Sequence, residues 1–134
     1  MGDDANVGLA ASGKGGGFTV EVLSRPAGGW SLSVESPAWC VEFELAAPGT
    51  VGELAAFLRS HAGRAGFAEL AVGTLGGLTV RVVKDDEFAD RFFLRAAGGG
   101  LLVEFTLADG IECDFAQAVA EAAAEFDAEV GPPA

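Results

Sequence analysis

The 134 residues carry 20 acidic and 8 basic side chains, for a net charge of −12, and half of the residues are apolar. This apolar fraction is typical of a globular protein, and the length predicts one domain that buries about two thirds of its unfolded surface. The charge argues against nucleic acid and anionic membranes as partners, because both are bound by neutralising phosphates with lysine and arginine.

No apolar stretch reaches the roughly 18 residues of a transmembrane helix. The N-terminal segment M-G-D-D-A-N-V is acidic where a secretion signal is basic. Cys40 and Cys113 lie far apart and form no C-x-x-C motif, a pattern typical of reduced thiols. We therefore expect a cytoplasmic protein of a microbe.

Residues 1–17 are predicted to be a disordered leader, because G-L-A-A-S-G-K-G-G-G has small residues and no periodicity. Gly8, Gly13 and Lys14 have the spacing of a phosphate-binding loop. That motif needs serine or threonine where Gly15 stands, and no strand is predicted before it. We expect no nucleotide site in this segment.

Three segments between residues 18 and 45 alternate apolar and polar residues, as strands with one buried face do. Turn residues at 25–29 and at Ser36-Pro37 separate them. Short loops of this kind predict an antiparallel meander. The side chains expected to face the core are Phe18, Val20, Val22, Trp30, Leu32, Val34, Trp39, Val41, Phe43 and Leu45.

A helix is predicted to begin at Thr50, which forms a capping box with Glu53. Gly63 and Gly66 are expected to end it. Its core-facing side, recognised from the helical spacing of apolar residues, comprises Val51, Leu54, Phe57, Leu58 and His61.

The second half is predicted to be mostly sheet again. Strands over 68–75 and 78–84 flank Gly76-Gly77, a two-residue hairpin turn, and a further strand covers 91–96. In the first hairpin we expect Leu78, Val80 and Val82 to pair with Leu75, Gly73 and Ala71.

The stretch from Leu101 to Phe115 is predicted to form another hairpin, around the turn 108–110. The preferred register buries the odd-numbered residues and leaves the acidic residues among them in solvent. It pairs Leu107 with Ile111, Phe105 with Cys113 and Val103 with Phe115, and exposes Glu104, Glu112 and Asp114.

After Asp114 an alanine-rich helix is predicted, with Asp114 and Gln117 as a capping box. Its apolar stripe ends before a disordered tail at 131–134, so the domain is expected to span 18–130. The stripe consists of Phe115, Val119, Ala122 and Phe126.

The fold class is α+β, with a single antiparallel sheet of about seven or eight strands in the order βββα-ββββ(β)α and two helices packed on one face.

Residue types that carry catalysis are sparse. His61, the only histidine, has no carboxylate or nucleophile beside it in the sequence, so we interpret it as a structural residue. Cys40 and Cys113 are expected to be packing residues and not nucleophiles. The acidic run 85–87 lacks the ligand spacing of a calcium loop, and no histidine–cysteine cluster suggests a transition metal. We predict no catalytic residue, metal or cofactor.

The outward side of the predicted strands collects carboxylates, including Glu21 and Glu35, together with several apolar side chains. The simplest interpretation is a solvated sheet face with charged cross-strand pairs. The alternative is a protein-binding surface, with a homodimer as its simplest form. Its binding residues would be Glu42, Glu44, Glu104, Glu112 and Asp114, with Phe93 and Leu102 as apolar anchors.

The order of elements over residues 18–126 resembles that of small uncharacterised acidic α+β proteins of actinobacteria and related GC-rich bacteria. The resemblance rests on three strands, the helix T-V-G-E-L-A-A-F-L-R-S-H, the segments L-T-V-R-V-V and L-L-V-E-F-T-L, and the alanine-rich helix. Some of these proteins are regarded as immunity proteins that neutralise polymorphic toxins. The resemblance implies a binding protein and carries over no functional residue.

The sequence therefore predicts a non-enzymatic cytoplasmic module, immunity-like or for assembly, whose acidic sheet face binds a basic protein or a second copy of the chain. Nucleic acid and membranes are not expected partners. The alternative is a small-molecule-binding protein or enzyme, with a pocket between the sheet and the first helix near His61.

Overall fold

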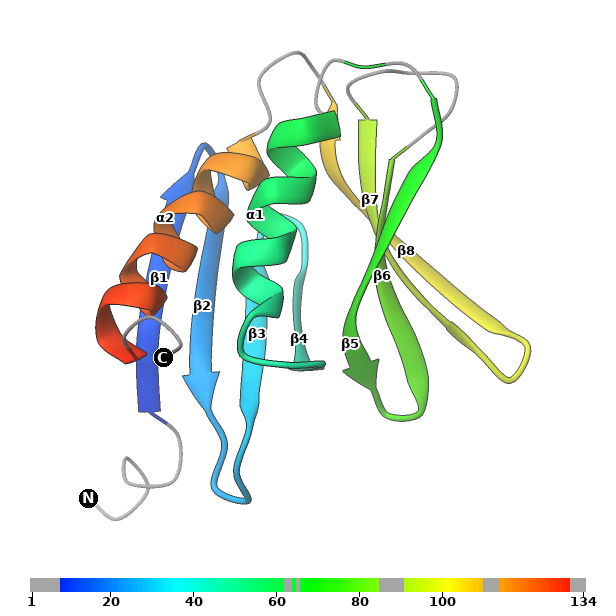
Figure 1. The fold of residues 1–134 in the computed structure, drawn as a ribbon. Coiled ribbons are helices and arrows are strands. Elements are labelled where there is room, and N and C mark those ends of the chain that lie inside the picture. The colour runs from blue at the N-terminus through cyan, green and yellow to red at the C-terminus, as the bar shows by residue number, and fades with distance from the viewer. Residues whose placement is uncertain (1–7, 62–63, 65, 85–90, 110–113, 131–134) are drawn as a thin grey trace.

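The computed structural model describes residues 8–61, 64, 66–84, 91–109 and 114–130. It confirms an α+β fold in which one antiparallel sheet of eight strands carries two helices on one face (Figure 1). Each strand pairs with its neighbours in sequence. The elements are β1 (Gly8–Gly15), β2 (Phe18–Ser24), β3 (Trp30–Glu35), β4 (Cys40–Leu45), α1 (Thr50–His61), β5 (Ala68–Leu75), β6 (Leu78–Lys84), β7 (Arg91–Gly98), β8 (Leu101–Asp109) and α2 (Asp114–Val130).

The prediction of a disordered leader is wrong for β1, which pairs with β2 and packs along α2. Residues 1–7 and 131–134 lie outside the described residues. The glycines of β1 allow a close approach of the helix: a Cβ at Gly13 would overlap the carbonyl oxygen of Ala118, and one at Gly15 that of Asp114. Glycine in a strand marks such an approach, which hydrophobic periodicity does not reveal.

Two carboxylates of α2 also cover the outer edge of β1. The backbone N–H of Ser12 donates to Glu125 Oε1 at 2.9 Å, and that of Lys14 donates to Glu121 Oε1 at 3.1 Å. An edge strand with unpaired backbone groups invites pairing with another chain. These two bonds remove that possibility from β1.

Replacing Glu121 and Glu125 together by alanine is expected to lower the free energy of unfolding by about 1–2 kcal/mol, because two backbone donors lose a charged acceptor at a solvent-accessible site. Alanine is the better helix former, so helix propensity works against this loss. Urea denaturation measures it. Asp127→Ala, at an exposed position of the same helix, is the control and should cost nothing. Equal stability of the double variant and the control would contradict the edge contact.

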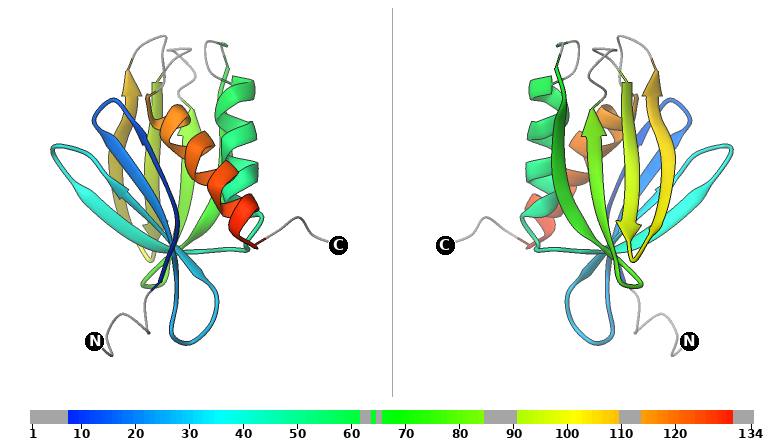
Figure 2. Two further views of the ribbon diagram at one scale, coloured as in Figure 1. Left: turned by 90° about the vertical axis from the view of Figure 1, so that its left-hand side faces the viewer. Right: turned by 90° about the vertical axis from the view of Figure 1, so that its right-hand side faces the viewer.

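The sheet has two halves, β1–β4 and β5–β8, that meet at a narrow junction. β4 and β5 share the Cα pairs Glu44–Thr74 and Leu45–Gly73, and Figure 2 shows the strands fanning apart. α2 follows β8 in the chain yet packs mainly on β1 and β2, while α1 contacts α2 and β5. A helix from the second half therefore covers the first half, and the two share one core.

An aromatic cluster brings the two halves together at one end of the core. The ring of Trp39, just before β4, lies 4.7 Å from that of Phe105 in β8 and 6.2 Å from that of Phe18 in β2. Phe18 in turn meets Phe115 of α2 edge-on at 5.7 Å. Such edge-to-face pairs stabilise beyond the area that they bury.

Most of the predicted inward positions of β2–β4 and of the two helices are buried, and the helix begins at Thr50 as predicted. The β5–β6 hairpin forms with Leu75 opposite Leu78, but a bulge shifts the register between Ala71 and Gly73. Val82 therefore pairs with Leu70 and not with Ala71. The extra residue of the bulge is Val72, which is fully buried.

The predicted hairpin over 101–115 is wrong in its pairing of Val103 with Phe115. Val103 pairs with Ala96 of β7, and Phe115 belongs to α2; residues 110–113, with Glu112 and Cys113, lie outside the described residues. Leu107 is buried and Phe105 partly buried, as expected, but Leu101 is 64% exposed and Val103 42% exposed. Alternation gave the direction of these side chains but not their burial, because α2 barely contacts β8.

Candidate functional site

Four glutamates gather on the sheet face opposite the helices: Glu21 of β2, Glu35 of β3, and Glu42 and Glu44 of β4. We call them the acidic patch. Glu21 and Glu42 both lie opposite Ser33, which stands between them in the sheet. All but Glu21 are exposed, and Glu21 is half-buried. Within the described part of the chain none of the four forms an ion pair.

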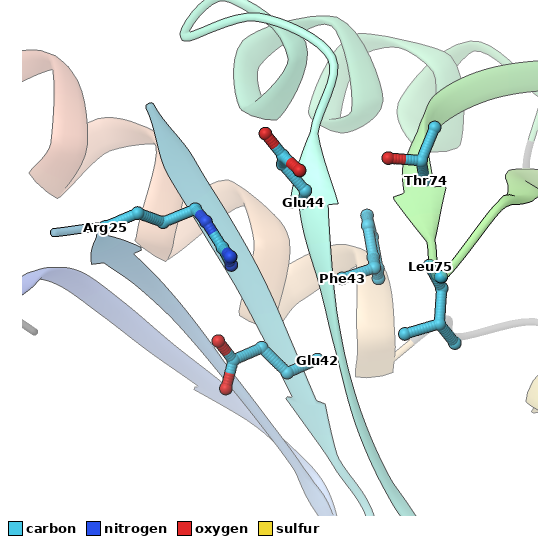
Figure 3. A pocket seen from close by; sticks show the side chains of 7 residues that line it. Arg25, Glu42, Phe43, Glu44, Thr74 and Leu75 are labelled. Carbon is cyan, nitrogen blue, oxygen red and sulfur yellow. The ribbon is translucent and has the colours of Figure 1, made fainter. Parts of the chain in front are cut away.

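A hollow of about 170 Å³ opens on this face at the junction of β4 and β5 (Figure 3). Glu42 and Glu44 project beside it from β4, and Thr74 and Leu75 approach it from β5. Gly73 makes the junction possible, because a Cβ there would overlap the carbonyl oxygen of Glu44. The lining residues are Arg25, Glu42, Phe43, Glu44, Thr74, Leu75 and Gly76.

Arg25 is the basic residue of this hollow. Its Nη1 donates to Ser31 Oγ at 2.6 Å, and the Ser31 residue is fully buried. The arginine lies beyond ion-pair distance of Glu42 and Glu44. The hollow therefore holds a tethered cation together with two carboxylates, and in the view of Figure 3 the Arg25 side chain lies between those of Glu42 and Glu44.

The outer face of the second half has a different charge pattern. Arg95 of β7 lies between Arg81 of β6 and Glu104 of β8 in the strand register. Arg95 Nη2 forms an ion pair with Glu104 Oε2 at 2.6 Å, and its Nε donates to the same oxygen at 2.6 Å. The charge of Glu104 is thus neutralised within the sheet.

The structure does not bring all the predicted binding residues into one surface. Glu42 and Glu44 belong to the acidic patch, whereas Leu102 and Glu104 of β8 lie four strand spacings away, roughly 19 Å along the sheet. Phe93 is in β7 and half-buried. The remaining two predicted residues do not extend either surface: Asp114 is the first residue of α2 and not a strand residue, and Glu112 lies outside the described residues.

The predicted pocket near His61 gains no support from the described residues. His61 is half-buried at the end of α1, with its ring 4.7 Å from that of Phe57, and the hollow at the β4–β5 junction lies among other residues. Cys40, expected to pack, is instead an exposed thiol opposite Glu35. No three histidine, cysteine or carboxylate residues of the described segments come together as metal ligands.

Two residues with a clear structural role were missed by sequence reasoning. Arg25 was assigned to a turn, and Lys84 to the end of a strand. Lys84 is fully buried, and its Nζ donates to the Gly66 carbonyl oxygen at 2.6 Å, which ties the segment before β5 to β6. The Lys84–Gly66 contact joins residues 18 positions apart, so their proximity depends on the fold. The Arg25–Ser31 contact crosses the β2–β3 turn, and the turn residues alone did not indicate it.

Neither described helix has the combination of length and apolar character that a bilayer-spanning helix needs. Comparisons with protein-family models, with curated proteins and with solved structures find no match.

Proposed function

We propose that this protein is a non-enzymatic binding module, immunity-like or for assembly, that holds a basic protein partner on its acidic patch. The observation that supports this most is the position of Glu42 and Glu44, which lack ion-pair partners among the described residues and flank a hollow. We place the module in the cytoplasm, where an exposed thiol such as Cys40 stays reduced.

The hollow suits the end of a lysine or arginine side chain from the partner. The aliphatic part of such a side chain would lie against Leu75, and its charged end would meet the carboxylates of Glu42 and Glu44. The other glutamates of the patch would act at longer range. Charges of this kind mainly accelerate the encounter with an oppositely charged partner and make binding sensitive to salt.

The test compares two variants of equal net charge. Glu21→Gln, Glu42→Gln and Glu44→Gln together neutralise most of the acidic patch, and a control neutralises three carboxylates elsewhere. Each changes the net charge from −12 to −9, since three negative charges are lost. Binding of a fluorescent decalysine peptide is measured by anisotropy at several salt concentrations. The control carries Glu53→Gln, Glu69→Gln and Asp127→Asn, all at exposed positions.

The patch variant is expected to bind the peptide roughly tenfold more weakly than the control, because it lacks three carboxylates of the patch that contribute about 0.5 kcal/mol each. Its affinity should also depend less on salt. If both variants bind equally well, net charge alone attracts the peptide and the acidic patch is not the binding surface.

A further inference from the structure

The two edge strands of the sheet, β1 and β8, differ in whether their outward backbone groups are hydrogen-bonded. At β1, the outward N–H groups of Ser12 and Lys14 are bonded by Glu125 and Glu121 of α2. At β8, no described residue outside β7 bonds the backbone. β8 is therefore the edge at which another strand can join the sheet.

The hairpin geometry shows which backbone groups of β8 point outward. In a two-residue hairpin the residues flanking the turn form a hydrogen-bonded pair, and the next residue on each strand points its N–H and C=O away from the partner strand. The β1–β2 hairpin obeys this rule, since Lys14 is the next residue after the pair Gly15–Phe18 and donates outward to α2. The same rule at the Gly99-Gly100 turn directs the backbone of Leu102 and Glu104 outward.

Exposed apolar side chains concentrate at this edge. Among the described residues, the large apolar side chains that are exposed are Leu9, Phe67, Leu101, Leu102 and Val103, and the last three are consecutive in β8. Burial of such side chains drives association. The edge thus offers both backbone hydrogen-bonding groups and apolar surface.

Charge indicates which strand would join. The chain carries −12 overall, so two copies repel each other across most of their surface. The exposed start of β8 is neutral, because Leu101, Leu102 and Val103 have no charge and Glu104 is paired with Arg95. A basic partner would find no unpaired negative charge among these residues. A second copy can approach by this edge, because both acidic patches then lie about four strands away from the contact.

From these observations we propose that two copies of this chain join through β8 in antiparallel fashion, which makes one continuous sheet. Side chains that lie opposite each other in an antiparallel pair point to the same face of the sheet. In a symmetric pair, one residue must therefore lie opposite its own copy, and the twofold axis passes between these two copies. An axis at Leu102 brings the two Leu102 side chains together on one face. It also places Leu101 of each copy opposite Val103 of the other, so all the exposed apolar residues of the edge are covered.

The first experiment measures self-association by sedimentation equilibrium from about 10 μM to about 1 mM protein. Leu102→Lys is expected to weaken the dimer at least tenfold, because two ammonium groups would face each other across the axis. The substitution makes the net charge less negative, so general repulsion between copies decreases while the dimer weakens. Leu102 is 59% exposed, so the monomer fold is unaffected.

Leu9→Lys is the matched control, because Leu9 is 58% exposed on the opposite edge strand, which α2 covers. It should leave the dimer unchanged. A monomer over the whole concentration range, or equal weakening by both lysine variants, would overturn the proposal.

A crosslinking experiment tests the register. In a Cys40→Ser, Cys113→Ser background, Leu102→Cys should be crosslinked between copies by a short bismaleimide reagent, which spans the roughly 5.5 Å between Cα atoms of a facing hydrogen-bonded pair. Thr106→Cys should not react in this way, because its two copies would lie roughly 26 Å apart along the strands. Crosslinking of both variants at the same rate would overturn the register.

This inference does not depend on the acidic patch. The glutamine substitutions of the decalysine experiment do not alter β8, and Leu102→Lys does not alter the acidic patch. Either proposal can therefore fail while the other stands.

Discussion

Gly13→Ala is expected to lower the free energy of unfolding by about 3 kcal/mol, at the upper end of the usual cost of overpacking. The added Cβ would overlap the Ala118 carbonyl oxygen and lie 2.7 Å from the Ala122 backbone nitrogen. Both are backbone atoms of α2, so the strain can be relieved only by moving the helix away from β1. Urea denaturation followed by circular dichroism measures the loss.

Gly52→Ala is the control for this substitution. Gly52 lies in α1, and a Cβ there would meet nothing within 4 Å. Alanine should therefore stabilise the protein, by up to about 1 kcal/mol, through helix propensity alone. If Gly13→Ala is as stable as the original protein, α2 does not pack on β1 in the way described.

Phe115→Ala is expected to cost about 3–5 kcal/mol, the usual range for deleting a fully buried aromatic ring. The ring of Phe115 is 0% exposed and holds the start of α2 against Phe18, which also contacts Trp39. Urea denaturation gives the loss of stability. Tryptophan fluorescence of the folded variant should change as well, because the surroundings of Trp39 loosen.

Phe67→Ala provides the comparison, since this ring is 56% exposed. Its removal should change the free energy of unfolding by no more than about 0.5 kcal/mol, as is usual at the surface. Similar losses for the two phenylalanines would mean that Phe115 is not in the core.

The parts of the fold that local patterns determine could be predicted. Alternation placed Val20, Leu32 and Phe43 inward, and Thr50 marked the start of α1. The Gly76-Gly77 turn correctly indicated a hairpin, since a two-residue turn with positive φ at both positions suits glycine. Each of these features is set by residues close together in the sequence.

The missed features depend on distant segments. β1 has little apolar alternation because Gly13 and Gly15 stand where α2 approaches too closely for a Cβ. The helix lies about a hundred residues later in the sequence. The hairpin over 101–115 satisfied every local rule, yet β8 pairs back to β7, which the local pattern allowed equally well. The bulge at Val72 is likewise invisible until both strands are aligned.

The candidate site was predictable only in part. Glu42 and Glu44 were expected to face outward from a single strand, and they do. Their placement beside a hollow requires the short β4–β5 junction and a glycine at position 73. Leu102 and Glu104 were assigned to the same surface because alternation gives the face of a sheet but not the distance between strands.

The most direct test of the proposed binding surface is an NMR titration of the protein with the decalysine peptide, with backbone amide shifts followed by residue. The proposal predicts that the largest shifts at low peptide concentration cluster at Glu42, Glu44 and Thr74 around the hollow. Shifts centred instead on α1 and α2, for example at Glu53 and Asp127, would contradict it.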